Sequence, residues 1–413
     1  MKTHIINIGD ELLIGQVVNT NASWMAQELN KCNIEVTNIV VIADDGDDIT
    51  AHLTKSLTEA DVVLITGGLG PTKDDITKTV LCRYFGDTLV THQPTLERVR
   101  IFFERRGLPF TEINQAQALV PSRCHVIINE VGTAPCMVFE KNGKIVVSMP
   151  GVPFEMKWLM TNHILPMLSA HLGNEAIVHR TVLTFGIGES FLAERIAAWE
   201  DALPHYIRLA YLPEAGKVRL RLSAYGSDHN ALTEEVDRQV AEIQILIGDN
   251  IYGYDNDTIQ SVVGKILAKQ HATVATAESC SGGLVANTIT QVPGASAYFM
   301  GSIVAYDNAV KSQLLDVDCT TLSQYGAVSE QTATAMALGC IKALDTDYAV
   351  ATTGISGPEG GTDEKPRGTV YIAIASKCGR TVCHKYVFQT TREEHQRRTS
   401  NQALFDLWTF IKK

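Results

Sequence analysis

Short apolar runs alternate with amphipathic stretches from residue 1 to about 165. Three runs rich in β-branched residues predict strands, namely HIINIG (4–9), EVTNIVVIA (35–43) and DVVLITGG (61–68). Between the first two runs, residues 21–31 repeat apolar positions at helical spacing, which predicts a helix capped by Asn21. Strand–helix–strand units of this kind indicate a mainly parallel sheet covered by helices.

The pattern changes after about residue 175. It predicts a strand HRTVLTFGI, a helix around SFLAERIAAWED, a strand KVRLRLSAYG and a long helix NALTEEVDRQVAEIQILIG. A turn-rich stretch, GDNIYGYDND (248–257), leads into a last region that opens with a helix, TIQSVVGKILAKQ, and a strand, ATVATA. We expect an α/β chain of three domains: an α/β sandwich (1–168), a small α+β module (175–250) and a second α/β domain (256–413).

Length and composition are those of a globular protein with more than one core. The chain has 413 residues, of which 45% are hydrophobic and 20% charged. The start, MKTHIINIGDE, has no long apolar segment, so we expect no signal peptide, no membrane partner and a cytoplasmic location. The nine cysteines include no CxxC pair, which favours buried thiols in a reducing compartment.

The net charge of −11 argues against a nucleic acid as the main partner, because affinity for a phosphate backbone comes mostly from clustered Lys and Arg. A site for a small phosphorylated ligand would then need local phosphate-binding groups, such as a helix N-terminus, a few cations or a divalent metal.

The loop GGLGPTKDD (67–75) follows a buried strand and precedes a helical pattern, which suits a phosphate cradle. Asp74 and Asp75 would repel a bare phosphate there, and a divalent cation would resolve the conflict. Asp10 and Glu11 follow the first strand, so the four acids could converge where parallel strands end. The plainer alternative is that Asp74 and Asp75 match the helix dipole and that Asp10 is a turn residue.

The run TAESCSGG (276–283) places Ser279 on a sharp turn between a strand and a helix. Ser279 is a candidate nucleophile, and the amides of Cys280, Gly282 and Gly283 could bind the oxyanion of an acyl transfer. Ser279 could instead be an N-cap. Cys280 is a rival nucleophile, but the C-terminal motifs quoted below contain no histidine to form a Cys-His pair with it. Glu278 could bind ribose hydroxyls or brace the turn.

The stretch GSIVAYDNAVKSQLL supplies a base for Ser279. Asp307 is expected to cap the following helix, with Lys311 in its early turns. Away from water and near the positive helix end, Lys311 could lose its proton, and Tyr306 could relay that proton or orient the lysine. As an alternative, Tyr306 and Lys311 could be a surface aromatic and a solvated cation.

A second glycine-rich loop, TTGISGPEGGTDEKPRGTV (352–370), follows another buried strand. It offers amides and hydroxyls for a ligand at Thr353, Gly354, Ser356 and Gly357, and Lys365 or Arg367 could neutralise a phosphate. A flexible surface turn is the alternative.

Several long motifs, in order along nearly the whole chain, resemble the CinA family. GDELLIGQVVNTN, TGGLGPTKDD, GTAP and MPGVPFEM are similar to its molybdopterin-binding-type N-terminal domain. AESCSGG, AYDNAVK, GAVSE and GISGPEGGTDEKPRGTV are similar to its C-terminal nicotinamide mononucleotide amidohydrolase domain. The middle region resembles the family's KH-like module, but it has no GXXG loop flanked by basic residues, so RNA binding is set aside.

The resemblance implies a homodimeric enzyme of pyridine-nucleotide salvage that acts on small nucleotides. The C-terminal domain would deamidate nicotinamide mononucleotide through an acyl-serine without a cofactor, and the N-terminal domain would hydrolyse ADP-ribose to AMP and ribose 5-phosphate with Mg²⁺, Co²⁺ or Mn²⁺. The alternatives are a pterin- or nucleotide-binding N-terminal module without hydrolysis, and a competence-related interaction protein.

The family's functional positions transfer to this chain as follows. The catalytic set is Ser279, Tyr306 and Lys311, and the metal ligands are Asp10, Glu11, Asp74 and Asp75. The substrate-binding residues are Glu278, Cys280, Gly282, Gly283, Thr353, Gly354, Ser356, Gly357 and Lys365, with Asn21, Gly67, Gly68, Gly70, Pro71 and Thr72 in the N-terminal domain. The chain departs from the usual pattern at Cys136, Ser281, Asp307 and Arg367.

Overall fold

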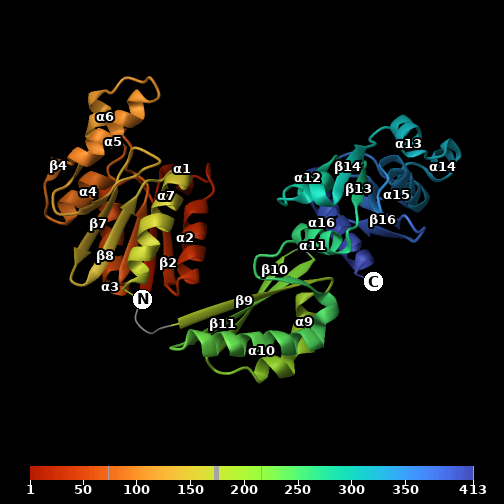
Figure 1. Ribbon diagram of the computed structural model, residues 1–413, viewed down its shortest axis with the longest axis horizontal. Coiled ribbons are helices and arrows are strands. Elements are labelled where there is room, and N and C mark those ends of the chain that lie inside the picture. Colours follow the sequence, from red (N-terminus) through yellow and green to blue (C-terminus); the bar gives the residue numbers. More distant parts are fainter. Residues whose placement is uncertain (73, 172–175, 215, 413) are drawn as a thin grey trace. The chain divides into compact units, whose positions relative to one another are not determined.

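The computed structural model describes residues 1–72, 74–171, 176–214 and 216–412. The chain divides into two compact units (Figure 1). The first unit is Met1–Val178 with Ser223–Val236, and the second is His179–Leu222 with Asp237–Lys413. The predicted start of the middle domain, residue 175, lies outside the described residues.

A six-stranded sheet with the order β2-β1-β3-β8-β7-β6 forms the centre of the first unit. Neighbours among the first four strands run parallel, whereas β7 is antiparallel to β8 and β6 is antiparallel to β7. The strands are β1 (Lys2–Ile8), β2 (Glu35–Ile42), β3 (Val62–Thr66), β6 (His125–Ile127), β7 (Cys136–Lys141) and β8 (Lys144–Met149). A mainly parallel α/β sandwich, as predicted, is therefore confirmed.

Alternate residues of β3 pack into two separate cores, one on each face of the sheet. Leu64 packs with Met25 of α2 (Thr20–Lys31) and Met156 of α7 (Pro153–Leu159). Ile65 packs on the other face with Leu53 of α3 (Gly46–Glu59). The first four residues of this strand are apolar because both of its faces are covered. The remaining helices and short strands are α1 (Asp10–Leu13), α4 (Thr77–Tyr84), β4 (Leu89–Thr91), α5 (Gln93–Glu104), α6 (Glu112–Ala116), β5 (Leu119–Pro121), η1 (Met160–Ile164) and α8 (Leu165–Ser169).

The helix cap expected at Asn21 is at Asn19 instead. The Asn19 side chain accepts from the N–H of Ala22 at 3.1 Å. Asn21 lies inside α2 and donates from Nδ2 to the carbonyl of Gly151 at 2.7 Å. The prediction was wrong because two asparagines two residues apart are equally good N-caps by residue type. Only the fold decides at which of them the helix begins.

The middle region is an α+β module with a four-stranded sheet, β10-β11-β9-β12. Its strands are β9 (Ala176–Phe185), β10 (Ile207–Glu214), β11 (Lys217–Gly226) and β12 (Ile251–Tyr254), and its helices are α9 (Glu189–Asp201) and α10 (His229–Ile247). The stretch 248–257, interpreted as a turn-rich connection, contains the short helix η2 (Gly248–Asn250) and β12, which pairs antiparallel with β9.

The C-terminal region has a five-stranded sheet with the order β14-β13-β15-β16-β17. The strands are β13 (Val274–Glu278), β14 (Phe299–Val304), β15 (Tyr348–Gly354), β16 (Thr369–Ser376) and β17 (Thr381–Val387), with β13 parallel to both of its neighbours. Because β13, β14 and β15 run the same way, the loops that follow them open at one edge of the sheet. The predicted α/β class is confirmed here too.

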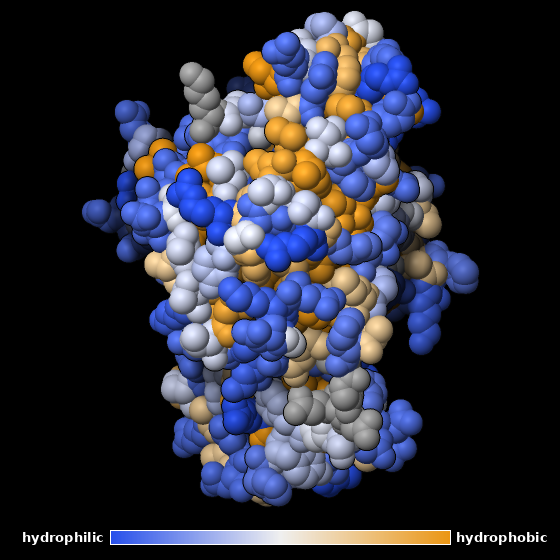
Figure 2. Space-filling view, turned by 90° about the vertical axis from the view of Figure 1, so that its left-hand side faces the viewer, coloured by the Kyte–Doolittle hydropathy of each residue, from blue (hydrophilic) through white to orange (hydrophobic). Residues whose placement is uncertain are grey.

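Helices cover both faces of this sheet. One core packs α11 (Ile259–Gln270), α12 (Leu284–Thr290) and α16 (Arg392–Ile411), and the other packs α13 (Asn308–Leu315) and α15 (Glu330–Leu344). The short helices are η3 (Ala295–Ala297) and α14 (Cys319–Tyr325). Within the described ranges, none of the helices combines the length and the apolarity that crossing a bilayer requires. Figure 2 shows hydrophilic side chains interspersed with patches of apolar ones on the face that it draws.

Candidate active site

Ser279 is held on a tight turn directly after β13. Its N–H donates to the carbonyl of Thr352 in the neighbouring strand at 2.9 Å, and its carbonyl accepts from the N–H of Gly282 at 3.1 Å. Gly282 and Gly283 have φ angles of +64° and +96°, a region that glycine enters without strain. The helix α12 begins after Gly283, so Ser279 is not its N-cap. In the described part of the chain, the Ser279 hydroxyl has no hydrogen-bond partner.

Glu278 braces this turn from inside the protein. Its carboxylate is fully buried and accepts from the N–H groups of Gly283 at 3.0 Å, Val285 at 3.0 Å and Ala286 at 2.8 Å. The hydroxyl of Ser281 donates to it at 2.7 Å. A carboxylate in this position satisfies the unpaired N–H groups at the start of a helix. The sequence left Glu278 open between binding ribose hydroxyls and bracing the turn, and its contacts support the bracing role.

Lys311 is buried although it is a lysine, with only 1% of its surface exposed. Its Nζ donates to the carbonyls of Ala305 at 2.8 Å and Tyr306 at 3.0 Å. Burial lowers the pKa of Lys311, against smaller opposing effects of Asp307 and Cys280. The Asp307 carboxylate caps α13 by accepting from the N–H of Ala309 at 2.8 Å, as expected.

The two carbonyl partners match an uncharged amine. A neutral amine has two N–H groups and one lone pair, whereas an ammonium has three N–H groups. In the uncharged form both N–H groups can donate to these carbonyls, and the lone pair stays available to accept a proton. Burial shifts the equilibrium of Lys311 toward this form.

Tyr306 contacts the lysine through its backbone and not through its phenol. Its side chain is 59% exposed, and its hydroxyl accepts from Nη2 of Arg392 at 2.7 Å. Nη1 of Arg392 donates to the carbonyl of Gly357 at 2.8 Å. Arg392, the first residue of α16, was missed from the sequence because no motif surrounds it and its partners are far away in the chain.

These residues line one cavity of about 280 Å³. It is lined by Ser279, Cys280, Tyr306, Asn308, Lys311, Ala327, Val328, Thr353, Gly354, Ile355, Ser356, Gly357, Glu359 and Arg392. All three predicted catalytic residues are thus on the wall of the same cavity, together with four predicted residues of the second glycine-rich loop. Lys365 is not among them, because its Nζ donates to the carbonyl of Tyr325 at 2.9 Å.

Cys280 also lines the cavity, but it is a poor nucleophile there. Burial raises the pKa of its thiol to about 12, so the reactive thiolate is scarce at neutral pH. The amides of Gly282 and Gly283, expected in an oxyanion pocket, donate to Ser279 and Glu278 instead. Of the three amides proposed for that role, only that of Cys280 has no oxygen acceptor among the described residues.

Ser356, at 6% exposure, is oriented by a buried histidine of α16. Its Oγ is 3.0 Å from Nδ1 of His395, whose Nε2 is 3.1 Å from the carbonyl of Gly368. A carbonyl only accepts, so Nε2 of His395 carries the proton and Nδ1 accepts from the Ser356 hydroxyl. Burial lowers the pKa of His395, which favours this neutral form. The lone pairs of Ser356 Oγ are then left to accept a hydrogen bond from a ligand.

The first unit has a cavity of its own, of about 470 Å³, at the carboxyl ends of its parallel strands. The predicted residues that line it are Glu11, Gly67, Gly68, Gly70, Pro71, Asp74 and Asp75. Asp10, Asn21 and Thr72 are not on its wall. The sequence reasoning missed Asp44 and Glu155, which also line it.

The predicted metal ligands do not form a ligand set by themselves. The carboxylate of Asp75 accepts from the N–H groups of Gly70 at 2.7 Å and Thr72 at 2.9 Å, so it is turned into its own loop. Among the residues described, no group of three or more His, Cys, Asp or Glu side chains is arranged to hold a metal ion. Burial raises the pKa of Asp44, and the nearby Asp10 and Glu11 raise it further.

Three family models match successive parts of the chain. They are a "Probable molybdopterin binding domain" over residues 4–170, a "Damage-inducible protein CinA KH domain" over residues 179–253 and a "CinA C-terminal domain" over residues 256–411.

Relatives match the chain over its full length. A "CinA-like protein" of Flavobacterium psychrophilum is 46% identical and covers 100% of this chain and 99% of its own. A second "CinA-like protein", of Cytophaga hutchinsonii, is 44% identical over 97% of this chain and 96% of its own. Among solved structures, the competence/damage inducible protein CihA of Agrobacterium tumefaciens is 34% identical and covers 38% of this chain and 98% of its own, with a TM-score of 0.36.

Proposed function

The chain belongs to the CinA family, and we propose that its C-terminal domain hydrolyses the carboxamide of nicotinamide mononucleotide to the carboxylate and ammonia. The observation that carries this proposal is the burial of Lys311 on the wall of the cavity that Ser279 also lines. Its Nζ donates to two carbonyls, and burial lowers its pKa, which favours the uncharged amine. An uncharged amine near a serine hydroxyl is the pairing that turns serine into a nucleophile.

The reaction follows from these two groups. The Ser279 hydroxyl gives its proton to the lone pair of Lys311 as its oxygen bonds to the carboxamide carbon, and the C=O π pair moves to the carbonyl oxygen, from which it returns when the C–N bond breaks. The Lys311 ammonium then returns the proton to the amide nitrogen, the C–N bond breaks and ammonia leaves. Lys311 takes a proton from a water molecule, whose oxygen adds to the acyl ester. The ester C–O bond then breaks, Lys311 returns the proton to the Ser279 oxygen, and the released acid ionises to the carboxylate.

Two further side chains suit this substrate. Arg392 lies on the cavity wall, and each of its two Nη groups donates one hydrogen bond to a protein oxygen. The second N–H of each Nη group remains to bind a phosphate. Because the Ser356 hydroxyl donates its proton to His395, toward a ligand it can only accept a hydrogen bond. It can therefore accept from an N–H of the carboxamide but cannot donate to an oxygen of the carboxylate product. The cavity therefore has separate groups for the two ends of a nucleotide amide.

Ammonia release from nicotinamide mononucleotide by the full chain tests the proposal. Ser279→Ala is expected to lower kcat/KM about 10³-fold or more, because the attacking oxygen is lost. Cys280→Ala is the matched control on the same turn and is expected to stay within about tenfold of wild type. A dead Cys280→Ala variant with an active Ser279→Ala variant would show that the thiol is the nucleophile.

For the N-terminal domain we propose a second nucleotide site that hydrolyses ADP-ribose. Its support is the cavity at the glycine-rich loop, where Gly67, Gly68 and Gly70 bring backbone close to a ligand. No group of three or more His, Cys, Asp or Glu side chains among the described residues could hold a metal ion, so a divalent ion would have to bind together with the ligand's phosphates.

Adding ADP-ribose with and without a chelator separates the candidate functions of this domain. Release of AMP that stops with the chelator is expected for the metal-dependent hydrolase. Tight binding of a pterin phosphate without turnover, with or without metal, would show a binding module instead.

A further inference from the structure

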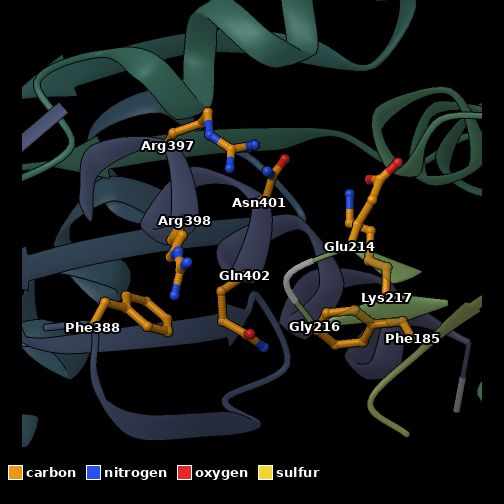
Figure 3. A pocket seen from close by; sticks show the side chains of 9 residues that line it. All are labelled: Phe185, Glu214, Gly216, Lys217, Phe388, Arg397, Arg398, Asn401 and Gln402. Carbon is orange, nitrogen blue, oxygen red and sulfur yellow. The ribbon is translucent and has the colours of Figure 1, made fainter. Parts of the chain in front are cut away.

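A separate cavity of about 420 Å³ lies in the second unit, between the small sheet and α16. Figure 3 shows the side chains on its wall, with Arg397 and Arg398 of α16 on one side and Lys217 of β11 on the other. The wall is completed by Phe185, Glu214, Gly216, Phe388, Asn401 and Gln402. It shares no residue with the wall of the Ser279 cavity.

The frame of this cavity is fixed by core packing. The ring of Phe185 stacks on that of Phe405 in α16, with centroids 3.5 Å apart and an interplanar angle of 2°. Tyr252 of β12 meets Phe405 edge-on at 5.1 Å, and both belong to the main core of the region. The strands and α16 are therefore joined by buried aromatic contacts, and the cavity is a built feature of the unit.

Positive charge is concentrated at this cavity although the chain as a whole is acidic. Four cations lie at or beside its wall, namely Lys217, Arg219, Arg397 and Arg398. Two carboxylates face them, since Glu214 pairs with Arg219 at 2.6 Å, and Glu394 pairs with both Arg397 and Arg398. The set keeps an excess of two positive charges in a chain with a net charge of −11.

Several donors of these cations remain for a ligand. The Lys217 ammonium lies over the ring of Phe405, 5.1 Å from its centroid, and the residue is partly buried. Among the described residues, it has no ion pair or hydrogen bond. Burial lowers the pKa of Lys217, Glu214 raises it, and Arg397 and Arg219 lower it further. Arg398 uses only Nε for Glu394, at 2.8 Å, which leaves both of its Nη groups. An excess of positive charge around a partly buried ammonium is costly, and an anion bound there would offset it.

The rest of the wall suits a ring attached to that anion. In Figure 3 the ring of Phe388 lies beside the guanidinium of Arg398, and Phe185 forms the wall near Lys217. Gln402 donates from Nε2 to Asp406 at 2.9 Å, so its Oε1 remains as an acceptor. Apolar rings with a few directed polar groups and clustered cations are the usual elements of a nucleotide site.

We propose that this cavity binds a nucleoside monophosphate, with the phosphate between Lys217 and the two arginines and the base against Phe388. It is a second nucleotide site of the C-terminal half, separate from the proposed amidase site and independent of whether that site is active. Both sites use α16, since Arg392 lines one and Arg397 and Arg398 line the other.

Calorimetric titration of the full chain with AMP at low ionic strength tests this site. Lys217→Gln and Arg398→Gln are each expected to raise the Kd for AMP about tenfold or more, because each removes a charge-assisted contact. Inorganic phosphate and adenosine alone are both expected to bind more weakly than AMP. Lys269→Gln, which removes an exposed cation of α11 outside the cavity, is the matched control and should leave the Kd unchanged.

The same titration in the Arg392→Gln variant separates this cavity from the Ser279 cavity. The proposal expects the AMP binding that depends on Lys217 to persist in that variant. It is overturned if AMP produces no binding heat, or if Lys217→Gln and Arg398→Gln bind AMP as wild type does.

Discussion

Lys311 shows how one residue's surroundings decide what its charge can be. A buried lysine stays protonated when a carboxylate pairs with its Nζ, but the Asp307 carboxylate, whose charge raises the pKa of Lys311, accepts from the N–H of Ala309. Among the described residues, the hydrogen-bond partners of the Lys311 Nζ are two carbonyl oxygens. Neutral partners cannot offset the cost of burying a charge in full, and the lowered pKa follows.

Residue types alone identified the site only in part. Ser279, Tyr306 and Lys311 could be picked out because a strand ends before each of their motifs, and parallel strands bring such ends together. Arg392 and His395 could not, since they lie on a helix that carries no glycine-rich signal and they reach the site only through tertiary packing. The role of Glu278 was ambiguous for the same reason, because bracing and substrate binding need the same carboxylate.

At the scale of elements, the turn between β13 and α12 depends on Glu278. Glu278→Gln is expected to lower the free energy of unfolding by about 2–3 kcal/mol, because charge-assisted bonds to three backbone N–H groups lose their charge. Ammonia release should fall as well, since the same turn positions Ser279. Chemical denaturation and the ammonia assay measure the two effects.

Glu330→Gln is the control for that substitution. Glu330 is an exposed acid in the first turn of α15, where the dipole contribution is only about 0.3–1 kcal/mol. It should therefore have a small effect on stability and none on activity. Equal stability of Glu278→Gln and wild type would contradict the bracing role.

Strands with a long run of apolar residues were predicted from the sequence, whereas a strand with a short and interrupted run was not. The apolar runs around β1, β3 and β13 are long enough to indicate strands directly. The strand β12 has only four residues between turn-forming ones, so its pattern was masked by its neighbours. It is a strand because β9 offers it an edge, which is a tertiary property.

At the scale of the whole molecule, the two units each have a cavity where parallel strands end, and the second unit has a further one lined with cations. An acidic chain with locally placed cations fits small anionic ligands better than a polyanion. Membership of the CinA family accounts for the order of the domains, whereas the proposed chemistry depends on the residues that line the cavities.

The pH dependence of ammonia release from nicotinamide mononucleotide tests the central claim most directly. Activity requires the uncharged Lys311, so kcat/KM should rise with pH as Lys311 loses its proton and then level off. Because burial lowers its pKa, the rise should end below the ordinary lysine value of about 10.4. Lys311→Met should abolish the rise together with the activity. A profile that rises only near that ordinary value, or a Lys311→Met variant as active as wild type, would contradict the account.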